Sequence, residues 1–342
     1  MSATNFARLP LVAVRCIASF ACGLLFTASA WAQAPAQPSG TVPQQQSQVR
    51  ALADSRVALQ NGAFTSVVAI DVPSFRSITP ALKLVYSSSA GNGFAGVGWE
   101  LSGFSTIERV SPGRGSPRYG LGWSSDRYTL DGEELIPSLA LGGTHATLRQ
   151  SFLRIVGRAP NEGNTWTVTR PDGTVMSYTP VFQTDAGTFR WGLTKTQDTH
   201  GNVVNYGWTC DKDGAGATLD CYPASVSYAN VVITLTPEAR TDRETFATGR
   251  RVGSRNWRLA WITIDVAGNR RNSYFLRYTN SVRTGRSLLK EVRPLGRDAV
   301  TALPSTSATY SEAASGFGAG TNVGYSYGLS THIWYYSQVY TD

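Results

Sequence analysis

Short stretches in which apolar and polar residues alternate dominate the chain from Gly62 onward. Valine, isoleucine, threonine and aromatic residues recur in short runs, and glycine, proline, asparagine or aspartate separates one run from the next. Alternation with a period of two is typical of strands with one buried face, whereas no run places apolar residues at helical spacing. The pattern predicts an all-β fold of many short antiparallel strands, organised as a shell-like or sandwich-like sheet module.

The expected strands follow one another closely along the sequence. Two turn signals are explicit, 171–173 (Pro-Asp-Gly) and 198–202, and each predicts a hairpin because its residues favour tight reversals. Nearly every connection is short, which favours antiparallel pairing between sequence neighbours. The runs that we expect to form strands are 63–73, 81–89, 127–132, 146–157, 164–170, 174–180, 189–198, 202–208, 225–237, 258–266 and 273–280.

The two ends of the chain differ from this pattern. Arg8 and Arg15 precede the apolar run 16–30, and Ala30-Trp31-Ala32 then supplies small residues where a signal peptidase cleaves. We therefore expect a signal peptide over 1–32 and a secreted, extracellular destination with the periplasm in transit. The alternative is an uncleaved N-terminal anchor. No other stretch reaches the ~20 apolar residues of a membrane helix, so no stable membrane span is expected.

The remaining segments give the expected domain organisation. Residues 33–60 are rich in proline and glutamine and predict a flexible leader. Residues 61–310 form the expected β domain. Residues 311–342 combine a Gly-, Ser- and Ala-rich linker with a strand-like aromatic run, which we interpret as the start of a truncated propeller repeat.

The positive charge of the chain is concentrated in one region. The formal net charge is +8, and residues 240–297 contain thirteen arginines and one lysine against four acidic residues. Such a region can attract nucleic acid, anionic lipid or an acidic partner, and it can also be a solvated sheet face. No nucleic-acid-binding motif accompanies it, so we expect no nucleic acid, and an acidic partner stays a hypothesis.

Two cysteines outside the expected signal peptide bracket a polar loop. Cys210 and Cys221 lie on either side of a run that looks like a hairpin tip, which predicts a disulfide in an oxidising compartment. Zinc needs about four ligands, and no histidine lies beside this pair. The loop also fails as a calcium site, because Ala215 and Tyr222 stand where oxygen ligands are required. We expect no metal and no cofactor.

A glycine-rich stretch, GNGFAGVG, contains the letters of a dinucleotide-binding loop. Such a loop needs a helix after its glycines, because the pyrophosphate lies at the N-terminus of that helix. Here the following residues alternate as in a strand, and Gly103 would break a helix. We therefore expect a tight strand connection, with glycine required by positive φ or close packing. The residues assigned to this structural role are Gly91, Asn92, Gly93, Gly96, Gly98 and Trp99.

Residues 86–110, YSSSAGNGFAGVGWELSGFSTIERV, closely resemble the signature of the SpvB-type N-terminal domain. This family includes the B components of insecticidal toxin complexes and is related to Rhs-type shell proteins. The resemblance continues in order from about residue 61 to residue 310. It implies a non-enzymatic β-shell or scaffold module of a secreted virulence protein, which helps to encapsulate or deliver a C-terminal toxic cargo. The implied partners are other toxin-complex subunits or that cargo.

No group of residues indicates catalysis. His145, His200 and His332 lack the sequence context of a nucleophilic triad. Residues 305–307 read Ser-Thr-Ser, as in ADP-ribosyltransferases, but no Glu-x-Glu follows, and in the resembled family that activity belongs to a separate C-terminal domain. We expect no enzymatic activity. The alternative function is a carbohydrate- or cell-surface-binding β-sandwich, since exposed tryptophan and tyrosine rings stack on sugars.

Overall fold

The computed structural model describes residues 53–57, 62–111, 113, 115–120 and 126–311. The chain divides into two units, Met1–Val49 and Arg50–Asp342, and every described residue belongs to the second. The expected signal peptide, most of the leader and the segment 312–342 lie outside the described residues.

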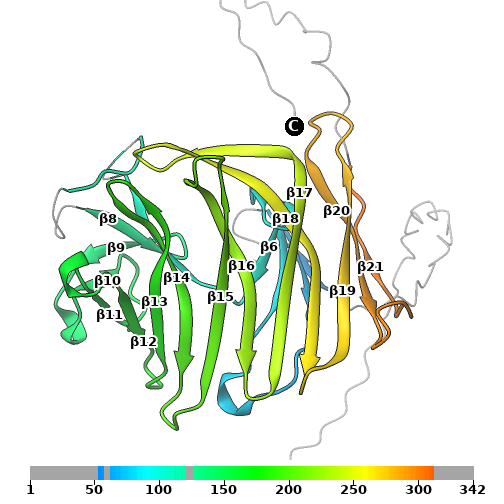
Figure 1. The fold of residues 1–342 in the computed structure, drawn as a ribbon, viewed down its shortest axis with the longest axis horizontal. Coiled ribbons are helices and arrows are strands. Elements are labelled where there is room, and N and C mark those ends of the chain that lie inside the picture. The colour runs from blue at the N-terminus through cyan, green and yellow to red at the C-terminus, as the bar shows by residue number, and fades with distance from the viewer. Residues whose placement is uncertain (1–52, 58–61, 112, 114, 121–125, 312–342) are drawn as a thin grey trace, which may run out of the picture. The chain divides into compact units, whose positions relative to one another are not determined.

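The prediction of an all-β fold is confirmed, and the strands form three antiparallel sheets (Figure 1). Only three short 3-10 turns, η1 (Arg76–Ile78), η2 (Ala140–Gly142) and η3 (Pro160–Glu162), interrupt the strands of the described part. Within the described residues no helix is long and apolar enough to cross a membrane. A small sheet has the order β1-β2-β3-β6, and its strands are β1 (Ala53–Val57), β2 (Phe64–Ala69), β3 (Lys83–Ser87) and β6 (Trp99–Ser102). A separate hairpin joins β4 (Asn92–Gly93) to β5 (Gly96–Val97).

The large sheet runs from β7 to β21. Its first strands are β7 (Thr106–Val110), β8 (Arg127–Leu130), β9 (Glu133–Pro137), β10 (His145–Thr147), β11 (Arg154–Gly157), β12 (Trp166–Thr169), β13 (Val175–Thr184) and β14 (Gly187–Gln197). The later strands are β15 (Val203–Lys212), β16 (Thr218–Tyr228), β17 (Val231–Ala247), β18 (Val252–Val266), β19 (Asn269–Asn280), β20 (Ser287–Leu295) and β21 (Thr306–Ser307).

Strand β14 is the branch point of the large sheet. Along one edge it pairs with β13, and along the other edge it pairs first with β7 and then with β15. Strands β7 to β14 therefore form a closed ring of eight strands. Its interior is packed with side chains rather than open, as expected for eight strands. The fully buried aromatic residues inside it are Tyr128, Trp166, Tyr178 and Trp191.

The small sheet covers one face of the open part of the large sheet. On β17, Val231, Ile233 and Leu235 are buried, while the residues between them are exposed, so one face of the strand is apolar. Those side chains pack with Leu84 and Trp99 from the small sheet in one core cluster. On the opposite face Trp261 stacks on Phe275 with ring centroids 4.4 Å apart. The alternation read from the sequence thus gives a two-layer core.

The structure differs from the sequence-based expectations in several places. The run 225–237, expected as one strand, is divided between β16 and β17 by a turn at Ala229 and Asn230. Residues 53–57, assigned to the flexible leader from composition, form β1, which pairs with β2 over five registered residues. Main-chain hydrogen bonding to an available sheet edge makes this strand, and such bonding leaves little trace in composition. The run 146–157, expected as one strand, is divided between β10 and β11 by a loop in which Phe152 has φ +56°.

Candidate functional site

The glycine-rich stretch forms the β4–β5 hairpin and leads directly into β6. Gly96 and Gly98 have φ of +95° and +76°, a region that side chains other than glycine rarely adopt. A Cβ atom on Gly96 would lie 2.7 Å from the carbonyl oxygen of Ser287, and one on Gly98 would lie 2.5 Å from the ring of Tyr86. The glycines are therefore needed for backbone geometry and close packing. Because β6 follows, the stretch lacks the helix N-terminus on which a dinucleotide loop depends.

Asn92 fixes this hairpin to the large sheet through a buried polar network. Its Nδ2 donates to Asp242 over 2.9 Å, and its Oδ1 accepts a hydrogen bond from Nη2 of Arg240. Arg240, which is 2% exposed, also donates through Nη1 to the Gly93 carbonyl over 3.2 Å. The backbone N–H of Ser287 donates to Asp242 over 2.7 Å. One network therefore joins the hairpin to β17 and β20.

The charge on Asp242 is held by these donors. Burial alone would raise the pKa of the Asp242 carboxyl group. Hydrogen bonds from Arg240, Ser287 and Asn92 outweigh burial and keep that pKa well below its usual range. The carboxylate is therefore ionised at every physiological pH and acts as a fixed structural acceptor.

Trp99, which follows the glycine-rich stretch, packs against the C-terminal end of the domain. Its Nε1 donates to the Tyr310 hydroxyl over 2.8 Å, and that hydroxyl donates to the Leu289 carbonyl over 2.8 Å. The Trp99 ring also lies 5.3 Å from the ring of Tyr86, measured between centroids. Five of the six residues predicted to be structural, Asn92, Gly93, Gly96, Gly98 and Trp99, thus occupy one packed corner, whereas Gly91 is exposed and no atom lies within 4 Å of the position that its Cβ would occupy. Sequence reasoning missed their partners Arg240, Asp242 and Ser287, which lie about 150 residues or more away and carry no local signal.

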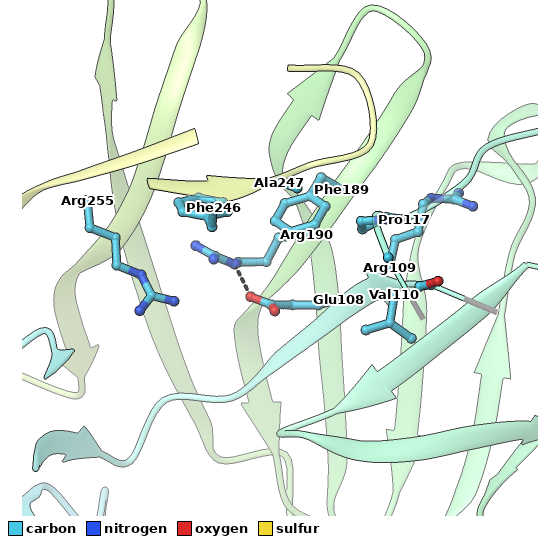
Figure 2. A pocket seen from close by; sticks show the side chains of 11 residues that line it. Glu108, Arg109, Val110, Pro117, Phe189, Arg190, Phe246, Ala247 and Arg255 are labelled. Atoms are coloured by element: carbon cyan, nitrogen blue, oxygen red, sulfur yellow. Dashed lines mark hydrogen bonds and ion pairs between the residues drawn. The ribbon is translucent and has the colours of Figure 1, made fainter. Parts of the chain in front are cut away.

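A second cluster of charged residues surrounds the branch point at β14. Arg190 pairs through Nε with Glu108 on β7 and through Nη1 with Asp220 on β16 over 2.7 Å. Figure 2 shows Arg190 and Glu108 pointing toward each other, with Arg255 to the left of both. Burial alone would lower the pKa of Arg190, but the two carboxylates outweigh burial and raise it. This ion triad ties the closed ring to the open sheet.

Gly192 and Trp208 complete the branch point. A Cβ atom on Gly192 would collide with the indole ring of Trp208, whose Nε1 donates to the Leu193 carbonyl over 2.9 Å. The indole thus lies directly against the backbone of β14, where the pairing partner changes from β7 to β15. Only glycine permits this approach.

A cleft of about 690 Å³, which we call the trough, opens beside the branch point. Its floor is formed by β15, β16 and β18 of the large sheet, which contribute Trp208, Tyr222 and Trp257. One wall is the β6 segment 100–102 of the small sheet, and the other wall comes from β7 and β8 of the closed ring. A smaller cavity of about 290 Å³ (Figure 2) shares Glu108, Arg190 and Arg255 with it.

Cys210 and Cys221 are joined by a disulfide in the structure. They are directly opposite each other in the β15–β16 register, at the base of the predicted hairpin tip. In that tip, Oδ1 of Asp213 accepts hydrogen bonds from the backbone N–H groups of Ala215 and Ala217, at 2.9 and 2.8 Å. The loop therefore uses its carboxylate to hold a turn. No group of side chains suited to hold a metal ion occurs in the described part of the chain.

The two histidines in the described part of the chain, His145 and His200, occupy a core and a surface turn. His145 is buried in the core of the closed ring, edge-on to Tyr128 and Trp166, and burial lowers its pKa to about 4. The side chain of His200 is 80% exposed in a turn organised by Asp198. His332 lies outside the described residues. Of the Ser-Thr-Ser sequence 305–307, the last two residues form β21 at the edge of the large sheet.

Four arginines of the basic region 240–297 pair with acidic residues that lie outside it in the sequence. Arg250 pairs with Asp185, and Arg258 pairs with Glu238 over 2.7 Å. Further pairs of this kind join Arg255 to Asp220 and Arg271 to Asp71. Part of the arginine excess is therefore used in ion pairs between strands, and an acidic partner stays a hypothesis.

Part of the chain is similar to a known protein family. Residues 58–182 match the family model of the Salmonella virulence plasmid 65 kDa B protein, SpvB. A stretch of 83 residues is 36% identical to the mono(ADP-ribosyl)transferase SpvB of Salmonella typhimurium. The resemblance to the SpvB family is confirmed. This stretch represents 24% of the chain and 13% of that relative, so most of the relative has no counterpart in the match.

Solved structures share the fold of the domain. The structure of the N-terminal domain of effector protein SpvB from Salmonella typhimurium strain LT2 matches with a TM-score of 0.54 at 17% identity, covering 65% of this chain and 95% of that one. The TcdB2-TccC3 structure matches with a TM-score of 0.62 at 18% identity, covering 75% of this chain and 17% of that chain. The fold therefore occurs both as a separate domain and as about one sixth of a much longer chain.

Proposed function

We propose that this protein is a non-enzymatic scaffold module of a secreted virulence protein of the toxin-complex or Rhs-like type. In this role its sheets form part of a shell that encloses or delivers a toxic C-terminal cargo. The observation that carries the proposal is the fold match to TcdB2-TccC3, in which 75% of this chain corresponds to 17% of a much longer one. The expected partners are the cargo itself or other subunits of such a complex.

The packing of the described residues supports a structural role. The interior of the closed ring is filled with aromatic side chains, and the family-signature glycines serve packing and backbone geometry. The buried charges that we located are tied to one another across strands, as in the Arg190 triad. Such arrangements hold strands in fixed positions, which is what a wall of joined sheets requires. The ADP-ribosyltransferase named in the SpvB relative is not assigned to this chain.

Export from the cytoplasm is part of the proposal. The disulfide between Cys210 and Cys221 supports an oxidising destination, because cytosolic thiols stay reduced. The sequence pattern of residues 1–32 points the same way. N-terminal sequencing of the protein recovered from culture medium tests it, with Gln33 as the expected first residue.

The scaffold role is tested by protection of a cargo. The complete natural polypeptide that contains this chain is expressed with a protease-sensitive reporter peptide in the segment that follows the module. We expect the reporter to resist cleavage in the folded protein and to be cut at the ordinary rate in the variant Gly96→Val, which distorts the packed corner. A reporter cut equally fast in both proteins would contradict the proposal.

The carbohydrate-binding alternative depends on accessible aromatic rings. Trp166 and Trp191 are fully buried, and Trp261 has one ring face covered by Phe275. Trp208 and Trp257 line the trough, so among the described residues they offer rings on which a sugar could stack. Reproducible binding on a glycan array that is lost in Trp257→Ala would favour this alternative.

A further inference from the structure

The wall of the trough formed by the small sheet is a strand edge that is open along part of its length. Strand β6 is the terminal strand in the order β1-β2-β3-β6 and pairs with β3 along one edge. On its other edge Gly93 of β4 packs directly against the Trp99 carbonyl group, so the open part consists of residues 100–102. Three consecutive residues, Glu100, Leu101 and Ser102, line the trough. Side chains alternate between the faces of a strand, so consecutive lining residues mean that β6 turns its edge toward the trough. An edge strand offers backbone N–H and C=O groups to another extended chain.

The floor beneath this edge is aromatic. The ring centroids of Tyr222 and Trp257 are 5.3 Å apart, and the Phe94 centroid lies 5.2 Å from that of Tyr222, which is itself buried. Nearer to the closed ring, Phe104 meets Trp208 edge-on at 5.6 Å. Side chains projecting from a strand added to β6 would lie over these rings. Such a surface suits apolar side chains and the aliphatic part of lysine or arginine.

The charges that line the trough leave an excess of carboxylate. Its three arginines are engaged in ion pairs: Arg190 with Glu108 and Asp220, Arg240 with Asp242, and Arg255 with Asp220 and Glu244. Glu100 and Asp131 also line the trough, and no ion pair joins either of them to a basic side chain in the described part of the chain. Glu100 is exposed. The unbalanced charge therefore favours a basic side chain in a ligand.

We propose that the trough binds an extended peptide segment of another polypeptide. The segment adds to the free edge of β6 as a strand, places a lysine or arginine beside Glu100, and lays apolar side chains over Trp208 and Trp257. Main-chain pairing supplies affinity, and the carboxylate supplies selectivity for basic sequences. This binding activity goes beyond the scaffold role, which requires no peptide ligand.

Defined peptides test the backbone part of the proposal. The probe is a fluorescein-labelled octapeptide of alternating valine and lysine, and its binding to the purified protein is followed by fluorescence anisotropy. Two further versions carry N-methyl groups, either on all valine nitrogens or on all lysine nitrogens. Alternate N–H groups of a strand point to opposite edges, so one version should bind about tenfold or more weakly while the other is little changed. Equal affinity of both methylated versions with the parent peptide would overturn strand addition.

Charge reversal tests the selectivity. A peptide with glutamate in place of lysine should bind the natural protein at least about tenfold more weakly than the lysine peptide. In the variant Glu100→Lys this preference should shrink or invert. The matched control is Glu134→Lys on β9, an exposed carboxylate that does not line the trough, and it should keep the original preference. Thermal unfolding of both variants establishes that they are folded.

Three outcomes overturn the proposal. The first is the absence of saturable binding of the lysine peptide at millimolar concentration, and the second is equal binding of the lysine and glutamate peptides. The third is binding of oligosaccharides that is lost in Trp257→Ala in a protein that does not discriminate between the peptides. That result would assign the trough to a carbohydrate. None of these outcomes bears on cargo protection, which tests the scaffold role separately.

Discussion

The substitution Gly96→Ala tests whether the family-signature glycines are structural. Gly96 has φ +95°, and alanine in a left-handed conformation costs roughly 1–2 kcal/mol. The added Cβ would also lie 2.7 Å from the Ser287 carbonyl oxygen, so backbone has to shift on one side of the contact. Relief of such overpacking costs typically about 1–3 kcal/mol. We therefore expect a total loss of about 2–5 kcal/mol in the free energy of unfolding.

Gly91→Ala is the matched control within the same motif. Gly91 is exposed, its φ is not positive, and no atom lies within 4 Å of the position that its Cβ would occupy. Alanine there should change the free energy of unfolding by less than about 0.5 kcal/mol. Both variants are measured by urea denaturation with tryptophan fluorescence, and thermal unfolding gives a second readout. For a domain of this size the Gly96→Ala loss corresponds to a melting temperature lowered by roughly 4–20 °C.

The two variants together test whether the backbone geometry at Gly96 determines the stability of the domain. If Gly96→Ala retains the natural stability, the close approach to Ser287 does not exist in solution. If Gly91→Ala is equally destabilising, the motif is sensitive for a reason other than the geometry described above. Calorimetry with NAD or ATP completes the test, because micromolar binding abolished by Gly93→Ala would restore the nucleotide-site interpretation.

Three further predictions concern the branch point, the buried histidine and the disulfide. Gly192→Ala should lower the free energy of unfolding by about 2–3 kcal/mol because it displaces the Trp208 indole. In a Trp208→Ala background this loss should nearly vanish, and additive effects of the two substitutions would contradict the contact. The folded-state pKa of His145 is about 4, below the unfolded value of about 6.5, so stability should be complete above pH 6.5 and fall by about 2–3 kcal/mol as pH drops to 4. His145→Phe should remove that part of the pH dependence in urea titrations, and an unchanged slope would refute the assignment. Non-reduced peptide mapping of the exported protein should show Cys210 linked to Cys221, and the double alanine variant should lose about 3 kcal/mol; two free thiols would contradict this.

Local features of the fold could be predicted from the sequence. The turns at 171–173 and 198–202 carry glycine and aspartate in the required positions, and both occur as hairpins between neighbouring strands. The reversal between β16 and β17 was missed because it uses Ala229 and Asn230 without glycine, although Ala229 has φ +45°. Closure of the ring was also beyond sequence reasoning. It depends on pairing of Arg190 with Glu108, residues about 80 positions apart that lie in strands indistinguishable from their neighbours by pattern.

The residues of the candidate site likewise fall into those that could be predicted from the sequence and those that could not. The positions that need glycine could be recognised, since missing side chains and turn-forming residues are visible in the sequence. Their partners Arg240 and Asp242 could not, because in the sequence they belong to a general excess of charge whose pairing appears only when strands are assembled. The trough could not be predicted from the sequence either, since its floor and walls come from strands distributed over more than 150 residues.

The most direct test of the scaffold role is a cryo-EM structure of the complete gene product with any subunits that copurify. The account predicts that the sheets described above join neighbouring sheets into a continuous wall around an enclosed volume, with the β4–β5 hairpin and Trp99 buried as they are in this structure. A map in which this unit stands as an isolated domain, with no neighbouring sheet continuing it and no enclosed volume beside it, would contradict the account.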